Sequence, residues 1–354
     1  VVAMGDPKKV GSIGIKSIGL YLVTTLFAII IGLILGTMFK PGDGIDLSGV
    51  DPFTSGVASM SVAERLFGII PMNPFASLAN GEVLPIIFFS ILLGIGIIMG
   101  GEKTKPIGNF FSAAAEAVLK VAHMVMQVAP YGVLSLVAWV SGTMGLAALQ
   151  NLLVLTLILY FGCLFHMVFV YGSLIRIFAK LPLKNFFRGI LDAQAVAYST
   201  SSSSATLPVT LQCVQENLGV KKTVASSVLP LGATINMDGT ALYLGIVALF
   251  AAQIFGIDLT FTDYLLIAMT ATLTSIGTAG IPSASLFLLA TVLSVIGVSD
   301  NQTALIVGFV LPFDRILDMA RTAVNITGDA TVSVLVAKSE NEIDEDVFRK
   351  NAVI

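Results

Sequence analysis

The sequence predicts an all-α membrane protein, a polytopic helical bundle, and two observations support that prediction. Of the 354 residues, 56% are hydrophobic and only 12% are charged, and the mean hydropathy is +0.93, whereas an average soluble domain carries about 25% charged residues. The second observation is a series of long apolar runs. Together they exclude a soluble enzyme and a disordered chain, and the net charge of -3 provides no basic surface for nucleic acid.

Six apolar runs are suited to cross a bilayer as helices, because about 20 residues span roughly 30 Å of hydrocarbon. They cover residues 17–39, 84–100, 121–140, 152–179, 224–256 and 303–337, the last with polar interruptions. Transmembrane β-strands need about 10 residues of alternating polarity, a pattern that these runs lack. The two cysteines, Cys163 and Cys213, have neither disulfide nor metal spacing, so redox chemistry is not expected.

The distribution of Lys and Arg predicts the orientation of the chain, because short cytoplasmic loops retain basic residues. Basic clusters precede the first run and recur near 103–105, 176–188, 221–222 and 338–350, whereas segments 142–151 and 297–302 contain none. This alternation places the C-terminus in the cytoplasm and predicts a multi-pass protein of the plasma membrane. The acidic tail at 340–346 is expected to be solvated.

Two segments are predicted to form re-entrant hairpins. Residues 181–218 lie between basic clusters and residues 262–297 between base-free loops, so each begins and ends on one face, yet their centres at 195–210 and 275–285 are polar. Irregular backbone at membrane depth is tolerated only inside protein or beside a water-filled cavity, so both tips are expected at one internal site. Polar interruptions follow at 236–240 and 325–329 and are expected to break their helices. This pairing resembles the inverted repeats of secondary transporters.

The last run contains a polar stripe. Steps of three and four residues place on one helix face Asp314, Asp318, Arg321 with Thr322, Asn325 and Asp329. Ionisable groups in a membrane helix indicate a functional site, and the alternative is an internal salt-bridge network. Arg321 offers a planar fork for a carboxylate, and Asp318 can accept hydrogen bonds from an ammonium group. An acidic amino acid would satisfy both, with Asn325 and Thr322 on its main-chain carboxylate.

A cation site is predicted around residues 236–240, where Gly239 allows the helix to unwind. Unwound carbonyls and carboxylates are hard oxygen ligands suited to sodium. The residues expected to share sodium ions are Asn236, Asp238, Asn325 and Asp329. No His or Cys lies near in the sequence, which argues against zinc or copper. His123 and His166 stand alone on apolar helices and are expected to pack rather than to carry protons.

The serine run at 201–204 precedes Pro208. Its hydroxyl groups and backbone amides at the start of a half-helix suit a substrate carboxylate. A flexible Ser-rich loop is the alternative interpretation.

A set of motifs that covers nearly the whole chain resembles the glutamate transporter family, the sodium-coupled symporters of acidic amino acids. The motifs are NPFASLANG at 73–81, VLPIIFF at 83–89, SSSSATLP at 201–208, LGATINMDGT at 231–240, SIGTAGIP at 275–282 and DMARTAVNITGD at 318–329. The resemblance implies a homotrimer in which a mobile transport domain slides like an elevator against a fixed scaffold. The second hairpin would be the extracellular gate.

The resemblance also implies site residues. Substrate contacts fall on Ser202, Ser203, Thr240, Gly280, Asp318, Arg321, Thr322 and Asn325. Sodium is implied at three positions, formed by Gly232, Asn236, Asn325 and Asp329; by Thr234, Ser275, Ile276 and Thr278; and by Tyr21, Thr24, Thr25, Asn236 and Asp238. Sodium is the coupling ion, and no other cofactor is implied.

By the same resemblance, residues 1–40 form the first transport-domain helix with a cytoplasmic lead-in. Residues 41–147 form an extracellular loop and the scaffold or trimerisation helices, and residues 148–354 form the rest of the transport domain. Two further scaffold helices are expected to precede Gly11 and to be absent from this chain. Arg315 is expected to substitute for an arginine that other members carry at Ser201 or Met319.

The predicted function is sodium-coupled symport of L-aspartate or L-glutamate, with no enzyme activity. The nearest alternative is a proton-coupled glutamate or C4-dicarboxylate symporter of the same fold. Leu244 stands where animal members carry a glutamate implicated in proton coupling, and dicarboxylate relatives lack the carboxylate of Asp318, so sodium and an amino acid are favoured. A passive anion channel and an intramembrane protease are more distant alternatives. The serine run has no His or Lys base nearby for a protease.

Overall fold

The computed structural model describes residues 7–45, 70–80, 83–276, 278 and 280–350. Within these residues the regular elements are helices, and one isolated antiparallel bridge joins Val220 to Ile343. The predicted all-α class is confirmed.

The helices have the following bounds: α1 Pro7–Phe39, α3 Pro74–Asn80, α4 Val83–Gly100, α5 Lys105–Met126, α6 Ala129–Phe165, α7 Leu183–Gly189, α8 Leu191–Thr200, α9 Ser203–Gln212, α10 Lys222–Ile235, α11 Asp238–Ile254, α12 Phe261–Ile276, α13 Ser285–Ser294, α14 Asp300–Ser339 and α15 Glu345–Lys350. Helix α6 continues into the π-helical segments His166–Tyr171 and Leu174–Ala179, and α9 into Cys213–Asn217. A short 3₁₀ turn, Gly101–Lys103, joins α4 to α5.

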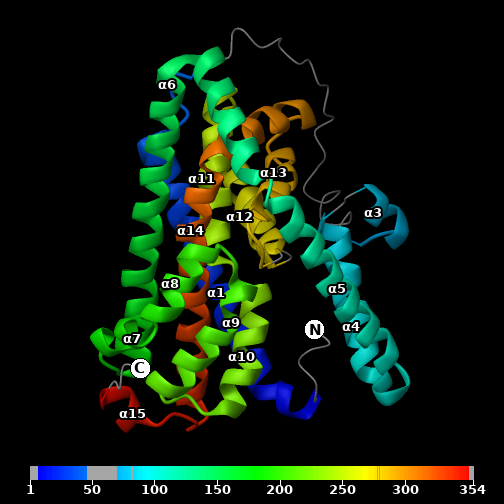
Figure 1. The fold of residues 1–354 in the computed structure, drawn as a ribbon, viewed down its shortest axis with the longest axis vertical. Helices are drawn as coiled ribbons and strands as arrows, with labels where there is room; N and C mark the ends of the chain where they lie inside the picture. Colours follow the sequence, from blue (N-terminus) through cyan, green and yellow to red (C-terminus); the bar gives the residue numbers. More distant parts are fainter. Residues whose placement is uncertain (1–6, 46–69, 81–82, 277, 279, 351–354) are drawn as a thin grey trace.

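Three helices form the centre of the molecule. Helices α1, α11 and α14 pack against one another (Figure 1), and every residue of α11 from Asp238 to Ala252 is buried. Gly32 of α1 permits the close approach, because a Cβ atom there would overlap the carbonyl oxygen of Leu242. The polar side chains of α11 from Asp238 to Ala252, and those of α14 from Asp318 to Ser333, are therefore buried in protein.

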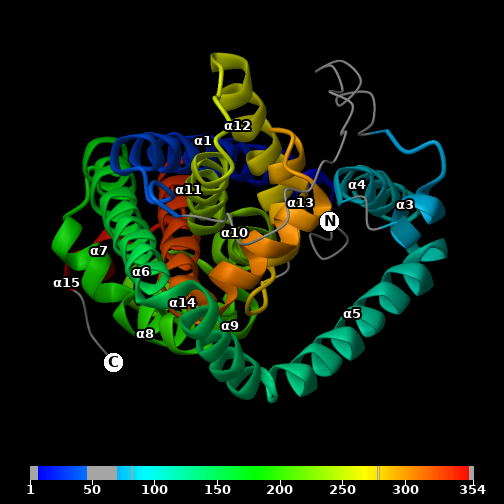
Figure 2. The ribbon, with the colours of Figure 1, turned by 90° about the horizontal axis from the view of Figure 1, so that it is seen from above.

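Helices α3, α4 and α5 form a separate group beside this centre. In both views α3, α4 and α5 lie to one side of the other helices (Figure 1, Figure 2), and large apolar side chains on them, such as Leu92 and Phe110, are exposed. Among the described residues, three helical segments are long and apolar enough to cross a membrane: Ser12–Phe39, Gln150–Ala179 and Lys222–Ile254. These segments agree with a multi-pass membrane protein.

Both predicted hairpins are present. Helices α8 and α9 pack together and are joined at Ser201, whose φ of 53° lies in the left-handed region. Ser202 caps α9, because its side chain accepts a hydrogen bond from the Ala205 amide. Helices α12 and α13 also pack together, so each polar centre forms the tip of a helical hairpin.

Two sequence-based boundaries are wrong. The predicted loop at 142–151 is helical and lies within α6, and the apolar run 121–140 is divided by the end of α5 and the start of α6. Uncharged Gly, Ala and Thr residues in that loop are compatible with a helix, so a lack of basic residues was insufficient to place a loop. The domain boundary at 147/148 falls inside α6, and the division into domains stays a prediction.

One of the two expected helix breaks is present. Helix α10 ends at Ile235 and α11 begins at Asp238, whereas α14 runs without a break through 325–329. Gly239 lies in the first turn of α11 rather than in the break, and a Cβ atom there would overlap the backbone of Arg321. Its role in the structure is therefore close packing of α11 on α14, and the expected break at 325–329 is wrong.

The C-terminal tail folds back onto the body of the protein rather than being fully solvated. Glu340 pairs with Lys16 at 2.6 Å, and Glu345 pairs with Lys338 and Arg349. The side chain of Phe348 in α15 is completely buried. The tail therefore ties the start of α1 to the end of α14.

Candidate functional site

The two hairpin tips meet. The Ser202 hydroxyl donates a hydrogen bond to the Gly280 carbonyl at 2.6 Å, and the Ser204 amide lies 3.3 Å from the same oxygen. A Cβ atom at Gly280 would approach Ser204 Oγ and the Ala233 carbonyl oxygen. Glycine is therefore required for this contact, and the predicted convergence of the tips is present.

Beside the tips lies a buried charge cluster on α14. The Arg321 Nη2 atom is 2.8 Å from Asp314 Oδ1 and 2.9 Å from Asp318 Oδ1, and the guanidinium carbon lies 4.1 Å from the centre of the Tyr243 ring. Asp318 Oδ2 accepts a hydrogen bond from the Ser283 amide of the second hairpin at 2.8 Å. The internal ion pairs that the sequence analysis kept as an alternative are thus present. The hydrogen bond from Ser283 links this charge cluster to the second hairpin.

These ion pairs leave part of the arginine available. Arg321 is fully buried, and its Nε and Nη1 atoms have no hydrogen-bond partner among the described residues. An unpaired buried donor on a charged group is costly. The arrangement therefore offers two N–H donor atoms to an anionic group.

A second cluster joins the break between α10 and α11 to α14. The Asn236 side-chain amide donates to the Asn325 carbonyl and to Asp329 Oδ1, both at 2.9 Å. The Gly239 amide donates to Asn325 Oδ1 at 2.8 Å. A Cβ atom at Gly232 would overlap Asp329 Oδ1. The structure therefore brings together all four residues of the first predicted sodium position.

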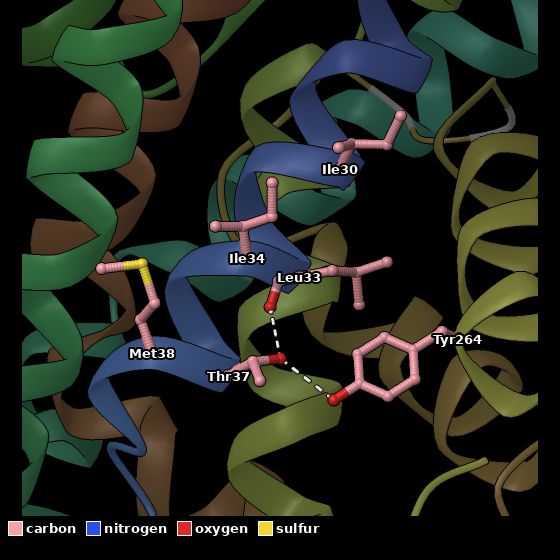
Figure 3. Close-up of a pocket in the computed structure, with 6 residues that line it drawn as sticks. All are labelled: Ile30, Leu33, Ile34, Thr37, Met38 and Tyr264. Carbon is pink, nitrogen blue, oxygen red and sulfur yellow. Dashed lines mark hydrogen bonds between the residues drawn. The ribbon is translucent and has the colours of Figure 1, made fainter. Parts of the chain in front are cut away.

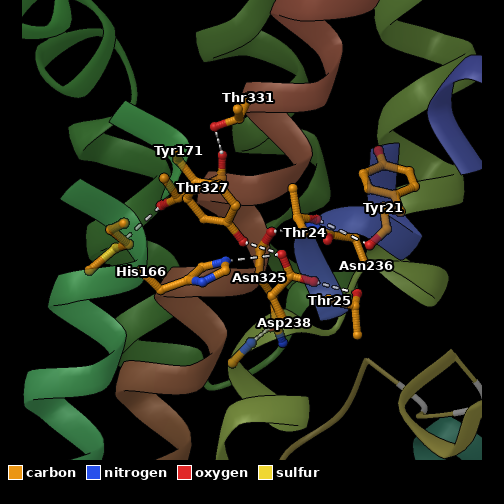
Figure 4. Close-up of polar contacts among 12 residues, drawn as sticks. Tyr21, Thr24, Thr25, His166, Tyr171, Asn236, Asp238, Asn325, Thr327 and Thr331 are labelled. Carbon is orange, nitrogen blue, oxygen red and sulfur yellow. Dashed lines mark hydrogen bonds and ion pairs between the residues drawn. The ribbon is translucent and has the colours of Figure 1, made fainter. Parts of the chain in front are cut away.

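A third cluster surrounds Asp238 (Figure 4). Thr25 donates to Asp238 Oδ1 at 2.5 Å, Tyr171 donates to Oδ2 at 2.7 Å, and His166 Nε2 lies 3.3 Å from Oδ2. A histidine that is distant in the sequence thus lies directly beside the predicted cation site, and His166 makes a polar contact there in addition to packing. His123 has no described side chain.

The other predicted sodium ligands are placed unevenly. Tyr21 and Thr24 are buried, and the Tyr21 hydroxyl donates to the Val228 carbonyl at 3.1 Å. A Cβ atom at Gly232 would overlap both that hydroxyl and Asp329 Oδ1. A further predicted set consists of Thr234, Ser275, Ile276 and Thr278. Thr234 is exposed, and its hydroxyl bonds to Leu231 within its own helix. The Ser275 hydroxyl bonds to Thr272. Hydrogen bonds among the described residues join Thr278 to Ser275 but do not join Thr234 to either.

The remaining predicted substrate contacts, Ser203, Thr240 and Thr322, are buried. Arg315 donates to the Ser199 carbonyl at the end of α8 at 3.0 Å, and its substitution for the arginine of other members stays a prediction. Among the described residues no group of three His, Cys, Asp or Glu side chains is placed to hold a metal ion. The donors gathered at this site are hydroxyl, amide and carboxylate oxygens, a set that suits a hard monovalent or divalent cation better than zinc.

Sequence reasoning missed Tyr171, His166 and Tyr243 as parts of the site. Tyr171 and His166 lie in an apolar run in which no spacing marked them, and Tyr243 lies one helical turn after Thr240 inside the buried helix α11. The position of Tyr243 relative to the 236–240 motif was the available signal.

A separate apolar pocket lies between α1 and α12 (Figure 3). It is lined by Ile30, Leu33, Ile34, Thr37, Met38 and Tyr264. The hydroxyl groups of Thr37 and Tyr264 lie 3.0 Å apart. None of the predicted site residues lines this pocket.

Comparison with known proteins gives consistent matches along the chain. The profile of the sodium:dicarboxylate symporter family matches residues 1–339. The chain is 34% identical to the proton/sodium-glutamate symport protein of Geobacillus stearothermophilus, over 98% of this chain and 83% of the relative. It is 37% identical to the proton/glutamate-aspartate symporter of Escherichia coli, over 97% and 80%. It is 35% identical to the C4-dicarboxylate transport protein of Bacillus subtilis, over 98% and 82%.

Proposed function

This chain belongs to the sodium:dicarboxylate symporter family, and from that premise we propose that it is a sodium-coupled symporter of the acidic amino acids L-aspartate and L-glutamate. Members of the family are transporters rather than enzymes, so the protease alternative is set aside. The relatives named above include carriers of glutamate, of aspartate and of C4-dicarboxylates. The choice of substrate must therefore be argued from this chain's own residues.

The observation that supports an acidic amino acid is the buried pair of Arg321 and Asp318 beneath the joined tips. Two unpaired N–H donor atoms on Arg321 suit a side-chain carboxylate. Asp318 pairs with the same arginine and is only 7% exposed. Its carboxylate attracts an ammonium group but repels a second carboxylate. An acidic amino acid carries all three charges in that pattern, whereas a dicarboxylate lacks the ammonium group.

Sodium is favoured as the coupling ion by the ligand chemistry of the neighbouring clusters. The Asn236 side chain joins the Asp329 carboxylate to the Asn325 carbonyl, and Asp238 with Thr25 forms a second group. These are hard oxygen ligands of the kind that hold alkali cations in transporters. The ions would be held by these residues while the substrate occupies the neighbouring charge cluster.

We further propose an elevator motion within a homotrimer, as the family resemblance implies. Support comes from the arrangement of α3, α4 and α5 apart from the helices that hold the site (Figure 2). Light scattering of the purified protein would measure the subunit number, and a monomer would contradict this part of the proposal.

The experiment that tests the function is uptake of labelled L-aspartate and L-glutamate into liposomes, first with an inward sodium gradient and then with a proton gradient alone. Accumulation only with sodium supports the proposal, and accumulation with protons alone would assign the chain to the proton-coupled alternative. In the same assay Arg321→Cys should weaken acidic substrates far more than neutral amino acids. Equal weakening of both would refute the contact between Arg321 and the substrate side chain.

A further inference from the structure

The helix that follows α6 has an unusual geometry at its contact with Asp238. Residues His166–Tyr171 form a π-helical segment, in which hydrogen bonds run from residue i to i+5. In an α-helix these two residues would point about 140° apart, whereas here they lie side by side with ring centres 4.6 Å apart. Single-turn π-helices are frequent at functional sites.

Both side chains contact the same oxygen atom of Asp238. Tyr171 donates to Oδ2 at 2.7 Å and His166 Nε2 lies 3.3 Å from it (Figure 4). An ionised carboxylate accepts hydrogen bonds from both groups when His166 carries its proton on Nε2. The two donors come from the α6 side, and they leave Oδ1 facing Thr25 of α1.

Space for the Tyr171 hydroxyl is provided by Gly328 of α14. A Cβ atom at that position would approach both the Tyr171 oxygen and the Asn236 side-chain amide. All three residues that hold Asp238 are essentially fully buried, with exposures of 0% for His166 and Tyr171 and 1% for Thr25. The carboxylate is therefore fixed by protein contacts on both oxygens.

From these contacts we propose that Tyr171 and His166 are positioning residues of the sodium site around Asp238. They hold Oδ2 in place, keep Oδ1 directed at the ligands of α1, and so set the affinity of the site for sodium without binding the ion. Hydrogen-bond partners that hold a metal ligand in place commonly change metal affinity about 10- to 100-fold. This inference rests on the sodium coupling proposed above.

The test is a sodium titration of labelled aspartate binding to the purified full-length protein. Tyr171→Phe removes the shorter hydrogen bond and is expected to raise the half-saturating sodium concentration about tenfold. His166→Leu should raise it less, because its contact is longer, and His166→Gln should restore the wild-type value by keeping an N–H donor. Tyr160→Phe is the matched control, since its hydroxyl bonds to Tyr198 and the Ile316 carbonyl rather than to Asp238.

The outcomes separate this inference from the proposed function. A raised half-saturation for sodium, with unchanged aspartate affinity at saturating sodium, supports a positioning role. If Asp238→Asn abolishes sodium dependence while Tyr171→Phe and His166→Leu leave it unchanged, the inference fails and the proposed function stands. Sodium-independent binding by the wild type would overturn both. Should Tyr171→Phe not fold, the comparison of His166→Leu with His166→Gln decides the question.

Discussion

The contact between the two hairpin tips depends on the hydroxyl group of Ser202. It donates to the Gly280 carbonyl at 2.6 Å and accepts from the Ala205 amide at 3.1 Å. In Ser202→Ala, loss of the first hydrogen bond costs about 1 kcal/mol and loss of the helix cap costs about 1 kcal/mol more. Loss of the hydrogen bond to Gly280 alone raises the fraction of molecules with separated tips about fivefold.

Hydrogen exchange of individual amides measures the two losses separately. The Ser204 amide donates to the Gly280 carbonyl, so its exchange should become about fivefold faster in Ser202→Ala. The Ala205 amide should also exchange faster, because it loses its cap. Ser202→Thr retains the hydroxyl and is the control. Faster exchange at Ala205 with no change at Ser204 would show that the bond between the tips has no energetic role, which would refute the reasoning.

Further changes test packing, ion binding and the tail. Gly239→Ala should destabilise the protein by about 1 to 3 kcal/mol, measured as a lower Tm, because the new Cβ atom would overlap the backbone of α14; Gly308→Ala, with open space around it, should not. Asp329→Asn should reduce the sodium dependence of substrate binding, and an unchanged dependence would remove Asp329 from the ion site. The hydrogen bond from Lys16 lowers the pKa of Glu340. The stabilisation from this contact is therefore fully present at pH values above the ordinary Glu pKa of about 4.3. It is lost as the pH falls through the lower pKa that Glu340 has in the folded protein. Glu340→Gln should abolish this acid sensitivity of amide exchange in the tail, and persistence of the sensitivity would assign it to another group.

Local patterns in the sequence were sufficient for the parts of the site that lie on one element. Helical spacing placed Asp314, Asp318 and Arg321 on one face of α14, and all three are buried together. The positions of basic residues indicated that each hairpin returns to the face from which it starts, and both hairpins are present. In each case the signal lies within a few turns of chain.

Features that depend on contacts between distant segments were not predictable in the same way. The approach of His166 to Asp238 requires a π-helical turn and the packing of α6 against α11, and neither is marked by a residue pattern. The intact helix through 325–329 was missed because its polar residues suggested a break, whereas in the structure one of them bonds to α11 and Gly328 makes room for the Tyr171 hydroxyl. Tertiary packing therefore decided where local composition was ambiguous.

Asn325 connects the two halves of the proposed site through its own atoms. Its carbonyl oxygen accepts from Asn236 at the break before α11, and its side-chain oxygen accepts from Gly239 in the first turn of α11. Its place on α14 is one turn beyond the arginine that would bind substrate. If one residue responds to both ligands, the factor by which bound sodium tightens aspartate must equal the factor by which bound aspartate tightens sodium, because linkage between two binding equilibria is reciprocal. Measuring the two factors independently would show how much of the free energy of ion binding this protein can transfer to its substrate.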